Sequence, residues 1–157
     1  MPTHHRKSIQ EIAEHVERLT PVSERTTPLD IKTTPKIILM VDDDRDHRDF
    51  LRYMLEKEGY VIREATDGAK ALDVLRSMYF LSDPQGLLPN LIILDVMMPV
   101  MNGLEFYVQL KFNKTFRDIP VLLVTGDENL ANHPSVVCLR KPVDMKTLLE
   151  TVKRHAK

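Results

Sequence analysis

The chain has 157 residues, of which 43% are hydrophobic and 29% are charged, a size and balance that suit one packed domain with an appendage. The formal net charge of −1 argues against broad electrostatic binding to nucleic acid or anionic lipid, and the single cysteine, Cys138, excludes an internal disulfide framework. No apolar run approaches membrane-spanning length and the N-terminus lacks the apolar segment of a secretory signal, so we expect a soluble protein of the cytoplasm.

The N-terminal part of the chain has the pattern of a helix followed by a linker. Residues 8–19 place five apolar side chains on one helical face. Residues 20–35 contain three prolines and five threonines, a composition typical of a linker. We therefore predict an extension over 1–35 and a main domain over 36–157. Two interpretations of the helix stay open: it packs on its own domain, or it docks a partner or pairs with a second copy to form a homodimer.

Short apolar runs alternate with helical patterns along the main domain. The expected strands are residues 37–41, 60–65, 91–96, 121–124 and 136–139. The expected helices are residues 46–58, 68–80, 103–113 and 144–155, with a short helix within 127–133 that Pro134 ends. Strands that alternate with helices imply parallel pairing through right-handed crossovers. The predicted fold class is α/β, with a doubly wound five-stranded parallel sheet and the polar strand 60–65 at its edge.

Polar side chains stand where four of these strands end. Asp42 and Asp43 follow the first strand, Asp95 lies near the end of the third, Thr125 follows the fourth and Lys141 follows the fifth. Because ligands of such sheets bind at the carboxyl ends of the strands, we expect these side chains to converge. Three neighbouring carboxylates raise at least one pKa unless a cation lies among them, and an all-oxygen ligand set suits Mg²⁺. An ionised Asp95 is then a competent nucleophile towards phosphorus.

Four stretches carry a resemblance to a known family: ILMVDDD, LIILDVMMPVMNG, PVLLVTG and LRKP, in this order. Together they resemble the receiver domain of two-component response regulators, of the CheY-like single-domain type, over residues 36 to about 155. The resemblance implies a flavodoxin-like sheet with the strand order 2-1-3-4-5. It also implies a signalling protein that takes a phosphoryl group from a histidine kinase or a histidine phosphotransfer protein. Such a protein is not a conventional enzyme, because it catalyses only its own phosphorylation and dephosphorylation.

The resemblance assigns roles by position. Asp95 is the expected phosphoacceptor, Thr125 the switch hydroxyl and Lys141 the partner of the phosphoryl group, with a cis peptide expected between Lys141 and Pro142. The expected Mg²⁺ ligands are Asp42, which acts largely through metal-bound water, Asp43, Asp95 and the backbone carbonyl of Met97.

Other residues near the site have smaller expected roles. Asp44 matches a variable third acid and is expected to be solvated. Met97 and Asp127 match positions that flank the path of an attacking water molecule. His47 lacks the spacing of a metal ligand, so the sequence gives no reason to place it in the site.

Three features depart from the family pattern. Cys138 stands three residues before Lys141, where the family usually has Tyr or Phe, so the usual aromatic coupling to Thr125 is in question. The stretch from Thr125 to Lys141 has room only for a short helix, which removes or alters the family's usual dimer surface. Residues 77–90 form an insertion before the third strand.

Two classes of function stay open. The first is a single-domain response regulator: the chain ends at Lys157, so we expect output through contact with an unknown downstream protein or through a phosphorelay, without binding to DNA or membranes. The alternative is a degenerate receiver that binds protein independently of phosphorylation, which Cys138 and the short helix favour. A phosphatase of the haloacid dehalogenase type is disfavoured, because Met97 occupies the position of its second aspartate.

Overall fold

The computed structural model describes residues 34–81 and 87–157. The predicted helix over 8–19, nearly all of the linker and the middle of the 77–90 insertion lie outside the described residues. The proposed division at residue 36 therefore stays a prediction. Within the described residues, no helix is both long enough and apolar enough to cross a membrane.

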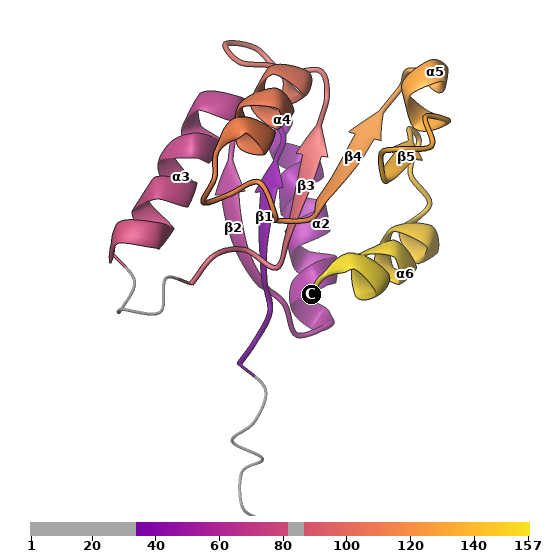
Figure 1. Ribbon diagram of the computed structural model, residues 1–157. Coiled ribbons are helices and arrows are strands. Elements are labelled where there is room, and N and C mark those ends of the chain that lie inside the picture. The colour runs from indigo at the N-terminus through magenta and orange to yellow at the C-terminus, as the bar shows by residue number, and fades with distance from the viewer. Residues whose placement is uncertain (1–33, 82–86) are drawn as a thin grey trace, which may run out of the picture. The chain divides into compact units, whose positions relative to one another are not determined.

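Five parallel strands form one sheet in the order β2-β1-β3-β4-β5 (Figure 1). The strands are β1 (Ile37–Val41), β2 (Val61–Ala65), β3 (Leu91–Asp95), β4 (Val121–Thr125) and β5 (Cys138–Arg140). The central strands β3 and β4 are buried along their whole length, which explains their continuous apolar sequence. The sheet order, the parallel pairing and the edge position of β2 confirm the predicted fold class.

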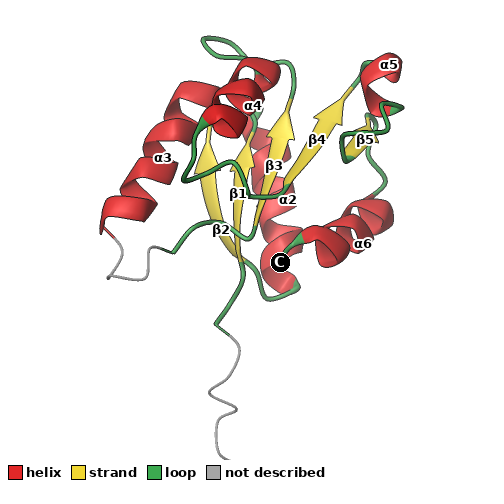
Figure 2. Cartoon of the chain, viewed as in Figure 1, coloured by secondary structure: helices red, strands yellow, loops and turns green. Residues whose placement is uncertain are grey.

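Helices cover both faces of the sheet (Figure 2). They are α2 (Arg45–Lys57), α3 (Gly68–Leu81), α4 (Gly103–Phe112), α5 (Glu128–Ala131) and α6 (Met145–His155). The apolar sides of α2 and α6 pack on one face of the sheet, and those of α3 and α4 pack on the other. The core therefore has two layers separated by the sheet.

Short polar side chains start most of these helices at the carboxyl end of the sheet. Asp44, Asn102, Asp127 and Asp144 each accept a hydrogen bond from a backbone N–H in the first turn of the helix that follows. Gly59 follows α2 with φ of +89°, a conformation that glycine adopts readily and that commonly ends a helix. These caps determine the residue at which each helix begins, and therefore where the loop between the preceding strand and that helix lies.

The prediction for the last strand is wrong at its start. Residues 136–139 were expected to be extended, but β5 begins at Cys138 and ends at Arg140. The backbone N–H of Val136 instead donates to the carbonyl of His133 across 3.3 Å, which holds that residue in a turn. The neighbouring helix α5 has only four residues, which confirms the prediction of a short helix before Pro134.

Candidate functional site

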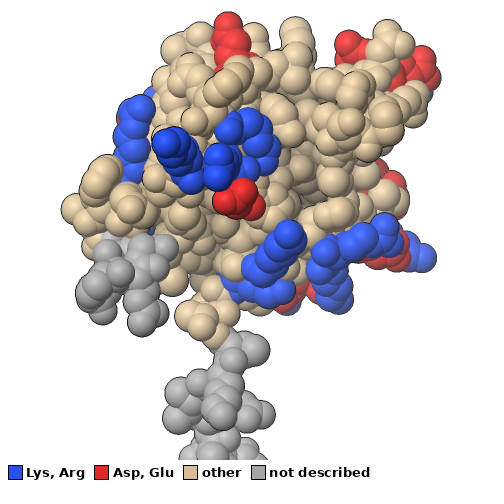
Figure 3. All heavy atoms as spheres, viewed as in Figure 1, with Lys and Arg blue, Asp and Glu red and all other residues tan. Residues whose placement is uncertain are grey.

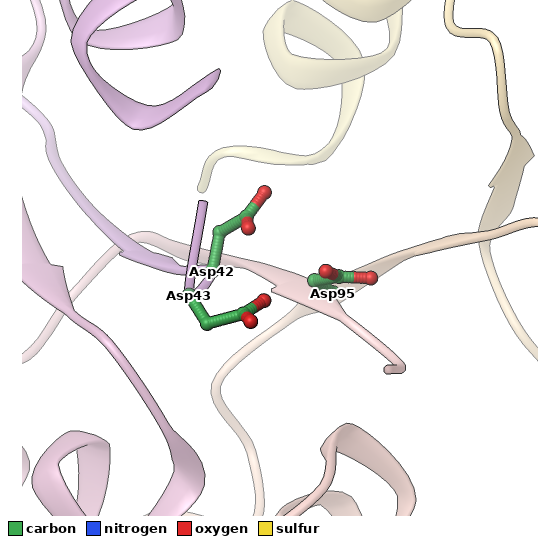
Figure 4. A group of neighbouring side chains, drawn as sticks. All are labelled: Asp42, Asp43 and Asp95. Carbon is green, nitrogen blue, oxygen red and sulfur yellow. The ribbon is translucent and has the colours of Figure 1, made fainter. Parts of the chain in front are cut away.

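Three carboxyl groups gather at the carboxyl ends of β1 and β3 (Figure 4). Oxygen atoms of Asp42, Asp43 and Asp95 all lie within 4.8 Å of one another. Asp42 and Asp95 are buried, with 4% and 5% of their surface exposed, whereas Asp43 is exposed. The strand-end rule therefore placed these three side chains correctly, because β1 and β3 are neighbours in the parallel sheet.

Asp95 is held through one of its two carboxylate oxygens. Lys141 Nζ donates to Asp95 Oδ1 across 3.1 Å, and the backbone N–H of Met97 donates to the same oxygen across 3.3 Å. Burial raises the pKa of Asp95 above its usual value; the charge of Asp42 adds to this effect and Lys141 opposes it. Both contacts orient the carboxylate and leave Oδ2 as the oxygen for chemistry.

Asp42 has hydrogen bonds to both of its carboxylate oxygens. Oδ1 accepts from the backbone N–H of Asp44 across 2.9 Å, and Oδ2 lies 2.5 Å from Nδ1 of His47. Burial alone would raise the pKa of Asp42, but the hydrogen bonds from His47 and Asp44 and the charges of His47 and Lys141 together lower it. The carboxylate of Asp42 is therefore ionised and fixed in orientation.

Sequence reasoning missed His47. The side chain lies in the first turn of α2, which begins next to the acids, so it returns to Asp42 across the turn. The hydrogen bond to Asp42 raises the pKa of His47 despite partial burial. The only signal in the sequence was a histidine five residues after Asp42, which by itself predicts no contact between the two side chains.

Thr125 and Lys141 complete the site from β4 and β5. Thr125 is 1% exposed, and its Oγ1 accepts from the backbone N–H of Asp127 across 3.0 Å. The N–H of Lys141 donates to the carbonyl of Thr125 across 2.8 Å, and the peptide from Lys141 to Pro142 is cis, as expected. The hydroxyl and the ammonium group are thus carried on adjoining backbone segments.

Cys138 and Asp44 lie close in sequence to the site residues. Cys138 is partly buried against the core in β5, and burial raises the pKa of its thiol, which fits a packing role. Asp44 is exposed and caps α2, as expected of a solvated acid.

The loop after Asp95 folds tightly onto the end of β3. The N–H of Gly103 donates to the carbonyl of Val96 across 2.9 Å. A Cβ atom at Gly103 would overlap the carbonyl oxygen of Asp95 and would lie 2.8 Å from Cα of Val96. The start of α4 therefore rests directly on the backbone of Asp95, which only a residue without a side chain permits.

The family comparison decides the identity of the domain. The model of the response regulator receiver domain matches residues 38–153. This chain belongs to the response regulator receiver family. It is therefore a signalling domain of two-component systems and not a conventional enzyme.

Named relatives share this receiver domain. Response regulator MprA of Mycolicibacterium vanbaalenii is 39% identical over 94 residues, which are 60% of this chain and 36% of that protein. The chain thus matches little more than a third of the length of such curated relatives. The chemotaxis response regulator CheY4 of Vibrio cholerae is 29% identical, with a TM-score of 0.65 over 77% of this chain and 98% of that one. The receiver domain of a histidine kinase from Syntrophus aciditrophicus is 30% identical, with a TM-score of 0.64 over 77% of this chain and 89% of that one.

The acidic cluster fits the Mg²⁺ that receiver domains bind. Carboxylates this close repel one another, and the buried pair has little water to screen that repulsion. A hard divalent cation with oxygen ligands offsets this repulsion, and the exposed side of Asp43 leaves room for the water ligands that Mg²⁺ retains. The residues present therefore suit the ion by charge, by ligand type and by access.

Proposed function

We propose that this receiver accepts a phosphoryl group on Asp95 from a histidine kinase or a histidine phosphotransfer protein, in a Mg²⁺-dependent reaction. The observation that carries the proposal is the position of Asp95. Its buried carboxylate is held by Lys141 at 3.1 Å and faces two further carboxylates within 4.8 Å. Lys141 and His47 are the ion-pair partners of Asp95 and Asp42, and Asp43 adds a third carboxylate to the cluster. A divalent cation held there, beside a nucleophile, suits phosphoryl transfer.

The chain's own residues would act as follows. Oδ2 of Asp95 attacks the phosphorus of the donor's phosphohistidine; a P–O bond forms, and the P–N bond breaks with its electron pair returning to the imidazole ring. Lys141 and the hydroxyl of Thr125 donate hydrogen bonds to the phosphoryl oxygens and stabilise their charge. Asp42, Asp43, Asp95 and the backbone carbonyl of Met97 would hold Mg²⁺. When bound, Mg²⁺ supplies further positive charge against the transferred group.

Hydrolysis would return the domain to its starting state. Water attacks the phosphorus of the aspartyl phosphate, and the P–O bond to Asp95 breaks to release inorganic phosphate. Met97 is 76% exposed beside the site and Asp127 caps α5 next to Thr125, so both side chains border the approach of that water. We infer that the signal passes on through protein contact or through a phosphorelay.

A second candidate is a receiver that binds its partner independently of phosphorylation. Two observations favour it: Cys138 replaces the usual aromatic residue, and α5 has only four residues. Both affect how a change at Asp95 would reach the surface, and neither affects the phosphorylation chemistry.

Small-molecule phosphorylation tests the first proposal. The chain is incubated with acetyl phosphate, with and without Mg²⁺, and its intact mass is measured. We expect the wild type to gain one phosphoryl group only with Mg²⁺, and Asp95→Asn to gain none. Asp118→Asn is the matched control, because that side chain is 92% exposed and lies outside the acidic cluster. A folded wild type that gains no phosphoryl group from acetyl phosphate or from a cognate kinase would support the second candidate.

A further inference from the structure

Helix α4 has apolar side chains on two opposite sides. Phe106 and Leu110 point into the core and are fully buried. Leu104, Val108 and Phe112 are 42%, 52% and 86% exposed on the other side. A helix with apolar side chains on two opposite sides can bury one side on its own sheet and the other only against further protein.

The outward residues form a continuous stripe, which we call the α4 stripe: Leu104, Val108 and Phe112. Residues four apart stack along one face of a helix, so the three side chains lie in line. A hollow of about 410 Å³ lies on this surface, lined by Leu104, Glu105, Val108 and Gln109. Figure 3 shows mostly uncharged surface over the upper part of α4, with an acidic group at its top and Lys and Arg gathered just below it.

The stripe is complementary to itself. If two copies of α4 pack antiparallel around Val108, Leu104 meets the partner subunit's Phe112 at both ends, and the smaller Val108 faces its own copy at the centre. A two-fold interface of this kind needs the same patch on both subunits, which one helix supplies.

The charges beside the stripe are compatible with this pairing. In the antiparallel arrangement each flank of the helix meets the same flank of its partner, so Glu105 lies within about 3 Å along the axis of the partner subunit's Gln109 and about 9 Å from a second glutamate. Lys111 on the other flank lies within about 3 Å along the axis of the partner subunit's Tyr107. The Nζ atom of Lys111 donates to the carbonyl of Arg117 across 2.8 Å, so this ammonium group keeps a hydrogen-bond acceptor in the dimer. The pairing also brings no two like charges together.

We propose that the α4 stripe is a homodimer interface in which α4 packs antiparallel on α4 of a second copy, centred on Val108. The proposal stands on the stripe alone and does not depend on phosphorylation of Asp95. It places the interface on α4 and not on the altered α5–β5 region.

Charge-swapped variants at the centre test this geometry. The full chain is studied by sedimentation velocity over a concentration series as wild type, as Val108→Lys and as Val108→Glu. We expect the wild type to dimerise and each variant alone to dissociate about a hundredfold or more readily, because two like charges then face each other across the two-fold axis. An equimolar mixture of the two variants should dimerise again, because lysine then faces glutamate.

The controls separate a specific effect at this interface from a general effect of surface charge or of misfolding. Tyr53→Lys changes an aromatic residue of α2 that is 56% exposed, and should leave the dimer intact. Circular dichroism confirms that each variant is folded. A wild type that stays monomeric at every concentration, as it would if another segment of the same chain covered the stripe, overturns the proposal. So does a dimer that both Val108 variants retain, or a mixture of the two that stays monomeric.

Discussion

His47 links the acidic cluster to the pH of the solution. Its Nδ1 lies 2.5 Å from Asp42, and this hydrogen bond raises the pKa of His47 above the usual 6.5. The folded state therefore binds the proton more tightly than the unfolded state. The stabilisation is fully present below pH 6.5 and is lost as the pH rises through the raised pKa.

A substitution at His47 makes this effect measurable. In Mg²⁺-free buffer, His47→Gln should lower the free energy of unfolding more at about pH 6 than at about pH 9, because more of His47 is protonated at the lower pH. Urea denaturation of the wild type and of His47→Gln at each pH gives the difference in their free energies of unfolding at that pH. Equal differences at the two pH values would show that the proton on His47 contributes nothing to folding.

Val100 has a backbone conformation that its side chain disfavours. Its φ is +67°, and its side chain is 86% exposed in the loop after Asp95. A β-branched residue in this region is strained, so Val100→Gly should raise the free energy of unfolding by about 1 kcal/mol. The same substitution at Val61, in the edge strand β2, should lower it, because glycine weakens a strand. Chemical denaturation of the two variants should show opposite signs; a loss of stability at both positions would contradict the assigned strain.

At the scale of elements, the contact between β3 and α4 positions the site. The first residue of α4, Gly103, rests on the backbone of Asp95 and Val96. Gly103→Ala forces these elements apart and should lower the free energy of unfolding by about 3 kcal/mol, the upper range for overpacking. Thermal unfolding followed by circular dichroism measures the loss.

Gly126 offers the matched comparison for that substitution. It follows β4, and a Cβ atom there would meet nothing within 4 Å. Gly126→Ala should therefore change stability by less than about 0.5 kcal/mol, as substitutions away from packed sites usually do. A similar loss in both variants would mean that glycine flexibility, and not the close approach to β3, determines the cost at Gly103.

At the scale of the whole molecule, the acidic cluster lowers the free energy of unfolding, and bound Mg²⁺ should raise it again. The raised pKa of Asp95 means that its ionised form is disfavoured in the folded state at neutral pH. In EDTA, Asp95→Asn should therefore melt roughly 2–4 °C above the wild type, the shift expected of about 1 kcal/mol in a chain of this size. Added Mg²⁺ should raise the melting temperature of the wild type more than that of the variant, because only the wild type keeps all three carboxylates.

Differential scanning fluorimetry provides these melting temperatures. Asp118→Asn should follow the wild type in both buffers, because its exposed side chain lies outside the cluster. Equal Mg²⁺ shifts in wild type and Asp95→Asn would place the ion away from Asp95.

The fold class and the position of Asp42, Asp43, Asp95, Thr125 and Lys141 at one edge of the sheet follow from the sequence alone. Buried parallel strands read as continuous apolar runs, and the residues just after such strands must share one edge of the sheet. Both signals are local in the sequence, so they can be recognised without knowledge of how the elements pack.

The packing of the elements was needed to establish which side chains support that site and which apolar surface is exposed. The contact of His47 with Asp42 depends on where α2 starts, and the start of β5 at Cys138 depends on a turn at Val136. The outward face of α4 could not be predicted from its composition, because both of its sides are apolar. Packing against the sheet selected Phe106 and Leu110 and left the α4 stripe exposed, because a helix can bury only one of its sides on a single sheet.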